Sequence, residues 1–145
     1  MRITRSLVVL VLVFAAGYLI GQLTRADLAA QAVPGQKVFE LRTYYTNPGK
    51  LPDLQTRFRN HTRKLFEAHG MTNVGYWVPQ DEPAHSNTLI YLIAHDSREA
   101  AKKNWAEFGK DPEWVKVRTE SEANGKIIEK IDSVFMDATD YSAIK

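Results

Sequence analysis

The nine residues VFELRTYYT, Val38–Thr46, decide the fold because they have the length and the β-branched and aromatic content of a β-strand. Side chains alternate across a strand, so residues 39, 41, 43 and 45 would share one face and residues 38, 40, 42 and 44 the other. The turn signal Asn47-Pro48-Gly49 follows at once. The chain is therefore predicted to leave the sheet after Thr46.

A helix is predicted after this turn, from about Lys50 to Ala68. Its inward residues recur at spacings of three and four, which is the period of one helical face. They are Leu51, Leu54, Phe58, His61 and Leu65. Gly70 is expected to stop the helix in the left-handed conformation. The remaining basic residues are interpreted as a solvated helix face: Arg57, Arg59, Arg63 and Lys64.

The rest of the body alternates strands and helices. Strands are predicted at 74–78, at 88–95 and around 128–136, with a polar loop over 80–87. Because 88–95 is the most apolar strand, it is expected to be central in its sheet. One helix is capped by Asp96 or Ser97 and ends at Gly109, and another begins at Asp111-Pro112.

The resulting order is β-α-β-β-α-α-β, which is typical of a ferredoxin-like α+β fold with a four-stranded antiparallel sheet. Helices would cover one face of that sheet. The other face is expected to carry Tyr44, Trp77 and residues of the last strand. Since an apolar face of that size requires a partner, the sequence predicts a homodimer, in which two sheets meet as a dimeric α/β barrel.

The segment 1–32 differs from the body, 33–145. It begins with Arg2 and Arg5, continues with an uncharged run over 6–24, and ends in the small-residue pattern Ala30-Gln31-Ala32. This layout is typical of a secretory signal peptide, and the run is also long enough to span a bilayer as a retained anchor. Either reading predicts an exported body, periplasmic or otherwise extracytoplasmic, and the anchor reading attaches it to the inner membrane.

Charge and composition exclude several classes of function. The body holds 16 Lys and Arg against 16 Asp and Glu, so its formal charge is zero, and the chain has no cysteine. A neutral body argues against a nucleic-acid partner. Without cysteine there is no disulfide, thiolate nucleophile or iron–sulfur site. His61 and His69 are about 12 Å apart along a helix, too far for one ion, so neither a metal nor a cofactor is predicted.

Two residues are candidates for chemistry. His61 lies on the predicted apolar stripe, where it is either a core histidine bonded to backbone or a ligand-binding or acid–base group. Arg42 shares a strand face with Glu40 and either forms an ion pair or holds a ligand carboxylate or phosphate. His95 precedes Asp96, but neighbouring strand residues point to opposite faces, so capping by Asp96 is the preferred interpretation.

The aromatic residues Tyr44, Trp77, Trp105 and Trp114 are expected in the core or an interface. The alternative is that Tyr44, Trp77 and Trp105 form the wall of a ligand pocket between sheet and helices.

Several short blocks in order resemble the NIPSNAP family. They are ELRTY (40–44), PGK (48–50), GYW (75–77), NTLIYL (87–92), DSREAA (96–101) and DPEW (111–114). The resemblance covers about residues 38–138 and implies the dimeric α/β barrel fold. It implies no defined reaction, and the export-type leader departs from the mitochondrial relatives.

Two functions follow as hypotheses. The first is a dimeric domain that binds a small apolar ligand or a protein. The second is a cofactor-independent oxygenase- or isomerase-like enzyme acting on a small aromatic or apolar substrate, with His61 as acid–base, Arg42 holding charge and a tryptophan packing the substrate. The enzyme hypothesis requires these three side chains to meet in one cavity.

Overall fold

The computed structural model describes residues 35–145. The predicted leader, 1–32, lies outside the described residues. Within the described part, no helix is both long enough and apolar enough to cross a membrane.

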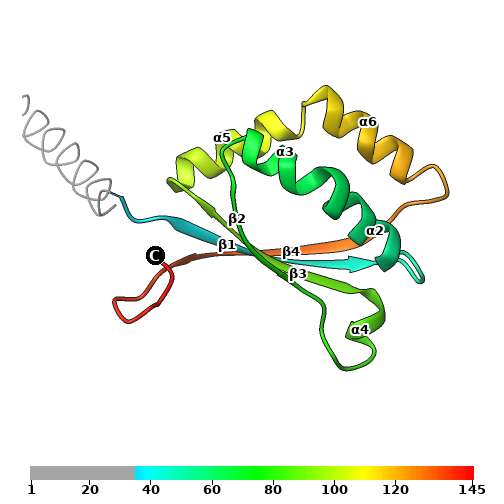
Figure 1. The fold of residues 1–145 in the computed structure, drawn as a ribbon, viewed down its shortest axis with the longest axis horizontal. Coiled ribbons are helices and arrows are strands. Elements are labelled where there is room, and N and C mark those ends of the chain that lie inside the picture. The colour runs from blue at the N-terminus through cyan, green and yellow to red at the C-terminus, as the bar shows by residue number, and fades with distance from the viewer. Residues whose placement is uncertain (1–34) are drawn as a thin grey trace, which may run out of the picture. The chain divides into compact units, whose positions relative to one another are not determined.

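The body is built on one four-stranded sheet (Figure 1). The strands are β1 (Val38–Thr46), β2 (Thr72–Trp77), β3 (Thr88–His95) and β4 (Ile128–Asp137). Their order is β2-β3-β1-β4, and every neighbouring pair is antiparallel. This confirms the predicted α+β, ferredoxin-like plan, with the apolar strand β3 inside the sheet.

The helices α2, α3, α5 and α6 lie together on one face of this sheet (Figure 1). The first runs without a break through α2 (Leu51–Arg57), the π-helical turn η1 (Phe58–Thr62) and α3 (Arg63–Ala68). Gly70 follows with φ +72°, the left-handed stop that the sequence predicts. The other helices are α4 (Ala84–Asn87), α5 (Arg98–Phe108) and α6 (Pro112–Ser121), of which α4 falls in the predicted loop.

Side-chain caps start the two later helices. The Ser97 hydroxyl accepts a hydrogen bond from the Ala100 amide, and the Asp111 carboxylate accepts from the Glu113 and Trp114 amides. Capping by Asp96 is therefore wrong. Its carboxylate forms an ion pair with Lys37 instead, because Ser97 already holds the N-cap position.

Tyr44 lies on the helix-covered face of the sheet, so its predicted place on the open face is wrong. It is buried against Phe58 and Tyr91, at ring-centroid distances of 5.9 and 5.2 Å. Strand alternation correctly groups Tyr44 with Glu40 and Arg42. Both faces of β1 carry large side chains, however, and the pattern within one strand does not say which face the helices cover.

The opposite face of the sheet is apolar. Trp77 and Val134 are 53% and 54% exposed, and Met136 is exposed as well. The strand register places Leu41, Ile90 and Leu92 on the same face. Trp77 thus occupies the open face, as predicted.

His61 is exposed, so its predicted place on the buried stripe is wrong. The π-helical turn is the physical reason. A π turn contains one residue more than an α turn, so the inward position after Phe58 passes to Thr62. The Thr62 hydroxyl donates a hydrogen bond to the carbonyl of Arg57 at 3.3 Å.

Candidate functional site

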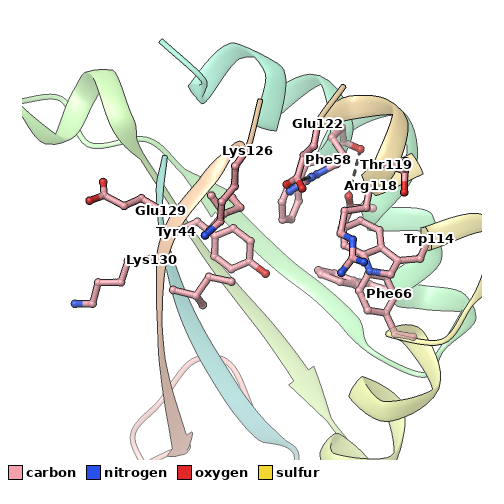
Figure 2. A pocket seen from close by; sticks show the side chains of 15 residues that line it. Tyr44, Phe58, Phe66, Trp114, Arg118, Thr119, Glu122, Lys126, Glu129 and Lys130 are labelled. Carbon is pink, nitrogen blue, oxygen red and sulfur yellow. Dashed lines mark hydrogen bonds and ion pairs between the residues drawn. The ribbon is translucent and has the colours of Figure 1, made fainter. Parts of the chain in front are cut away.

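An open cleft of about 710 Å³ separates the first helix and α6 from strands β1 and β4 (Figure 2). Aromatic rings and basic side chains dominate its lining. The lining residues are Tyr44, Arg57, Phe58, Thr62, Phe66, Phe108, Trp114, Arg118, Thr119, Glu122, Lys126, Ile128, Glu129, Lys130 and Ile131. A volume of this size is typical of sites for small organic molecules.

The π-helical turn shapes one wall of the cleft. Two of its five residues, Phe58 and Thr62, line the cavity, and Arg57 immediately precedes the turn. All three side chains are buried, although the predicted apolar stripe includes only Phe58 among them. Such single π turns occur frequently at functional sites.

Aromatic rings line the inner part of the cleft. Phe58 and Phe66 meet edge to face at 6.0 Å, Phe66 and Phe108 at 5.1 Å, and Phe108 lies 4.5 Å from Trp114 between ring centroids. On the sheet side the cleft is closed by Tyr44 and Ile131, which pair across β1 and β4. Ile131 is 41% exposed although it faces the helices, so the layer between sheet and helices is not filled here.

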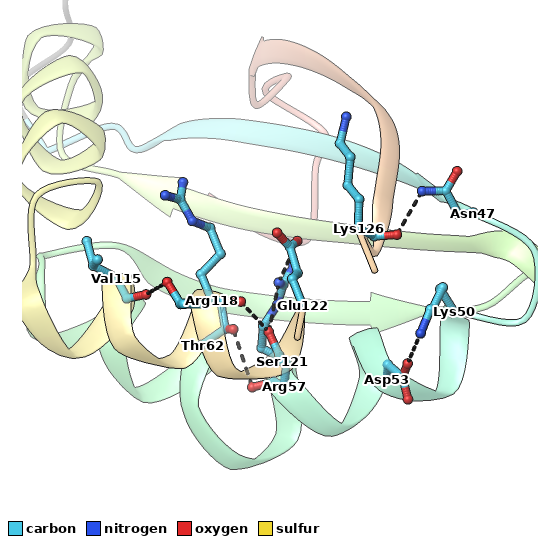
Figure 3. A network of polar contacts seen from close by, with 11 residues as sticks. Asn47, Lys50, Asp53, Arg57, Thr62, Val115, Arg118, Ser121, Glu122 and Lys126 are labelled. Carbon is cyan, nitrogen blue, oxygen red and sulfur yellow. Dashed lines mark hydrogen bonds and ion pairs between the residues drawn. The ribbon is translucent and has the colours of Figure 1, made fainter. Parts of the chain in front are cut away.

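A buried arginine stands at the helical wall. The side chain of Arg57 is 3% exposed, and its Nη1 donates to the Ser121 hydroxyl and to the Glu122 carboxylate, both at 3.2 Å (Figure 3). Its guanidinium lies 5.3 Å from the centre of the Trp114 ring. Because these partners hold it in place, Arg57 presents a fixed positive charge beside aromatic surface.

The other end of the same layer is closed by a polar cluster around Glu40. This carboxylate is 1% exposed and accepts four hydrogen bonds. Oε1 accepts from Arg42 Nη1 at 2.7 Å and from the Ser133 hydroxyl at 2.6 Å. Oε2 accepts from Trp105 Nε1 at 2.6 Å and from His95 Nε2 at 3.0 Å. The cluster is thus a filled structure with no room for a ligand on the carboxylate.

The four donors decide the charge of Glu40. Burial alone would raise the pKa of this carboxyl group, but the hydrogen bonds from His95, Ser133, Trp105 and Arg42 outweigh burial and lower the pKa to about 2. Glu40 is therefore an anion at neutral pH. The Glu40–Arg42 ion pair that the sequence predicts is present, and Arg42 also stacks 4.2 Å from the Trp105 ring centre.

The structure does not bring the sequence candidates together. Tyr44 lines the cleft, while Arg42 and Trp105 belong to the Glu40 cluster. Trp77 borders a separate hollow beside β2, and His61 borders a shallow one between the first helix and α6. The convergence of Arg42, His61 and a tryptophan that the enzyme hypothesis requires is absent from the described residues. Among residues 35–145 there is also no group of three potential metal ligands.

Of the lining residues, sequence reasoning placed only Tyr44 at a pocket, and it misjudged two on the first helix, Arg57 and Thr62. Arg57 was assigned to the solvated face of the first helix, whereas it is buried and paired with Glu122. Thr62 falls outside the predicted apolar stripe and yet lines the cavity. Both errors have one source, since a regular helix was assumed through η1. No residue type within 58–62 signals a π turn.

Comparison with known proteins agrees with the fold. The NIPSNAP family model matches residues 39–143. A NIPSNAP family protein of unknown function from Agrobacterium tumefaciens superposes with a TM-score of 0.66 at 20% identity, over 77% of this chain and 96% of that one. A NIPSNAP-like domain protein from Burkholderia xenovorans gives a TM-score of 0.64 at 15% identity, over 74% and 90%.

A further similar structure is a monooxygenase, ActVA-Orf6 of Streptomyces coelicolor, in complex with the ligand Nanaomycin D. It superposes with a TM-score of 0.53 at 16% identity, over 78% of this chain and 96% of that one, and this likeness concerns the fold alone. No match was found among curated proteins. The family match spans most of the body, and the sheet and helices have the architecture of dimeric α/β barrels. The chain therefore belongs to the NIPSNAP family.

Proposed function

We propose that this domain binds a small apolar, ring-containing molecule in the cleft between the sheet and the helices. The observation that carries the proposal is the open, aromatic-lined cavity of about 710 Å³ at a place where a well-packed core would be filled. Its inner rings, Phe58, Phe66, Phe108 and Trp114, offer faces and edges for stacking against a ligand ring.

The π-helical turn supports the same proposal. Regular α-helical hydrogen bonding is interrupted at the wall of the cavity, where it places Arg57 and Thr62 on the inner side. An interruption that opens rather than fills the layer is unfavourable for packing. A role in ligand binding would explain why the π turn lies at the cleft.

The second candidate function is a cofactor-independent oxygenase or isomerase that uses the same cleft. The fold shared with a monooxygenase that was solved in complex with the ligand Nanaomycin D favours it. Catalysis would have to come from polar groups at the cleft, such as Tyr44 and Thr62, because His61 and Arg42 do not line it. Turnover of a bound aromatic compound with oxygen consumption would distinguish this function from binding alone.

The binding proposal is tested with a neutral aromatic probe, 2-naphthamide, titrated into the purified full chain by isothermal calorimetry. Ile131→Trp places a large ring at the sheet side of the cleft and should weaken binding at least about tenfold. The matched control is Val115→Trp, an exposed position on α6 that does not line the cleft. Saturable binding that is lost only in Ile131→Trp supports the proposal. Failure of the wild-type chain to bind either 2-naphthamide or its ionised analogue 2-naphthoate contradicts it.

We also propose that the domain is a homodimer through the open face of the sheet. The apolar side chains exposed there, including Trp77, Val134 and Met136, favour burial against a second copy. Native mass spectrometry of the full chain should show a dimer. Val134→Lys should give a monomer, while Ile131→Lys on the opposite face of the same strand should leave the dimer intact.

Export of the body, with residues 1–32 either cleaved or retained as an anchor, remains a proposal that rests on sequence. Fractionation of cells that express the full chain with a C-terminal tag tests it. A tagged protein found outside the cytoplasm, or in the inner-membrane fraction, supports export, and a cytoplasmic protein contradicts it.

A further inference from the structure

The cleft is basic as well as aromatic, although the body as a whole is neutral. Among the charged lining residues, Arg57, Arg118, Lys126 and Lys130 are cations and Glu122 and Glu129 are anions. In Figure 2, Glu129 and Lys130 extend away from Trp114 and the helical wall. The remaining three cations face one anion, Glu122, which Arg57 already binds.

Arg118 has no carboxylate partner among the described residues. Its side chain extends from α6 toward the strands, as both close-up views show (Figures 2 and 3). The neighbouring cation of α6, Lys116, differs, since it points away from the cleft lining and lies 3.9 Å from the Glu120 carboxylate. Helix α6 therefore carries two cations that differ. Lys116 is paired with Glu120 at the surface, whereas Arg118, which lines the cavity, has no carboxylate partner among the described residues.

Arg57 adds donors that are not satisfied. Its Nη1 is occupied by Ser121 and Glu122, but no described residue accepts a hydrogen bond from Nε or Nη2. Nε is fully enclosed, which leaves Nη2 as the nitrogen without a partner among the described residues. A carboxylate oxygen can accept one charge-assisted hydrogen bond from this nitrogen.

We infer that the ligand of this cleft is an anion, an aromatic molecule that carries one carboxylate, whose ring packs against the phenylalanines and whose charge lies between Arg57 and Arg118. This inference rests on the proposed binding function and adds the charge of the ligand. Trp114 joins the two parts of the site, because its ring contacts Phe108 on one side and the Arg57 guanidinium lies over it.

The test compares two probes of nearly equal shape in the purified full chain: 2-naphthoate, which is ionised at neutral pH, and 2-naphthamide, which is neutral. Calorimetric titration at low ionic strength should give about tenfold tighter binding of the naphthoate. Arg118→Gln should remove most of this preference and leave the affinity for naphthamide within about twofold. Lys116→Gln makes the same change of charge on the same helix and should alter neither affinity.

Arg57→Lys is the second variant, because it keeps the buried charge opposite Glu122 and removes Nη2, the nitrogen proposed to bind the ligand. It should weaken naphthoate binding about three- to tenfold, with naphthamide unchanged and an unaltered thermal unfolding midpoint. Equal affinities of the two probes for the wild-type chain, or equal losses for both in Arg118→Gln, would overturn the anionic ligand while leaving the binding function standing. Failure of both probes to bind overturns the binding function and this inference together.

Discussion

The layer between the sheet and the helices ends in two different ways along the same pair of strands. At one end, Glu40 and Ser133 take part in a cluster in which each carboxylate oxygen accepts two hydrogen bonds. At the other end, Tyr44 and Ile131 face an open cleft. The two ends are close together, since Glu40 and Tyr44 lie four residues apart on β1 and Ser133 and Ile131 lie two residues apart on β4.

The difference teaches how a small domain separates stability from binding. A buried charge is tolerated when its hydrogen bonds are made, and both oxygens of the Glu40 carboxylate have theirs, although Arg42 Nε and His95 Nδ1 beside it lack partners. The cleft end differs in leaving the apolar side chain of Ile131 exposed to an open volume. We therefore expect substitutions at the Glu40 end to change folding free energy, and those at the cleft end to change affinity.

The largest effect is expected from Glu40→Ala. It removes the acceptor of four donors and leaves the guanidinium of Arg42 without its ion-pair partner. Loss of one member of a buried pair should lower the free energy of unfolding by about 3–5 kcal/mol. Urea unfolding of the full chain at fixed protein concentration measures this. Glu129→Ala, on the rim of the cleft, is the control, and a similar loss in both variants would contradict the comparison.

The second-largest effect is expected from acid pH, which should lower the free energy of unfolding that Glu40 contributes. The pKa of Glu40 is lowered from 4.5 to about 2, so the folded protein binds the proton less readily than the unfolded chain. The stabilisation is complete above the unfolded pKa and is lost as pH falls through about 2. It corresponds to about 3 kcal/mol. Unfolding free energies measured on the way from neutral to acid pH should show this slope in the wild type. Glu40→Gln should lack it, and an unchanged slope would argue against an ionised, hydrogen-bonded Glu40.

A smaller effect is expected from Trp105→Phe. The substitution keeps an aromatic ring beside Phe66 and Phe108 but removes the indole N–H that donates to Glu40. A hydrogen bond to a charged acceptor contributes about 1.5–3 kcal/mol, which is the expected loss in unfolding free energy. Tyr141→Phe changes an exposed ring outside both the cluster and the open face of the sheet, and it serves as the control. An equal loss in both variants would mean that the hydrogen bond from Trp105 to Glu40 is not responsible.

The smallest effect on stability is expected from Ile131→Ser at the cleft. Ile131 is already 41% exposed, so its truncation removes little buried apolar area. The free energy of unfolding should stay within about 0.5 kcal/mol of the wild type in the same urea experiment. A loss comparable to that of Trp105→Phe would mean that the cleft is part of the packed core.

The sequence was sufficient to predict the order of strands and helices, because each element has a local periodicity of apolar residues. The Glu40–Arg42 pair could be predicted for the same reason, since its members are two residues apart on one strand. The other partners of Glu40 could not. His95, Trp105 and Ser133 are separated from it by 55, 65 and 93 residues, and their meeting depends on strand register and on helix placement.

The cleft was only partly predictable. A pocket wall of Tyr44, Trp77 and Trp105 between sheet and helices is the alternative interpretation of these aromatics, beside the core or an interface, and Tyr44 does line the cleft. Trp105 instead donates its N–H to Glu40, and Trp77 lies on the open face. An empty volume is a property of how elements meet, so the pattern within each element carries no signal for it.

The π-helical turn between Phe58 and Thr62 inserts one extra residue into an otherwise regular helix. Each residue of an α-helix advances the winding by about 100°, so a regular helix would place Phe66 about half a turn away from Arg57. The π turn takes up one residue without advancing the winding, and both side chains therefore face the same cavity. Deleting one residue from this turn would restore regular winding and leave the two halves of the helix in phase. A one-residue deletion elsewhere in the helix would rotate one half against the other, so the cleft should be more sensitive to a deletion outside the turn than to one within it.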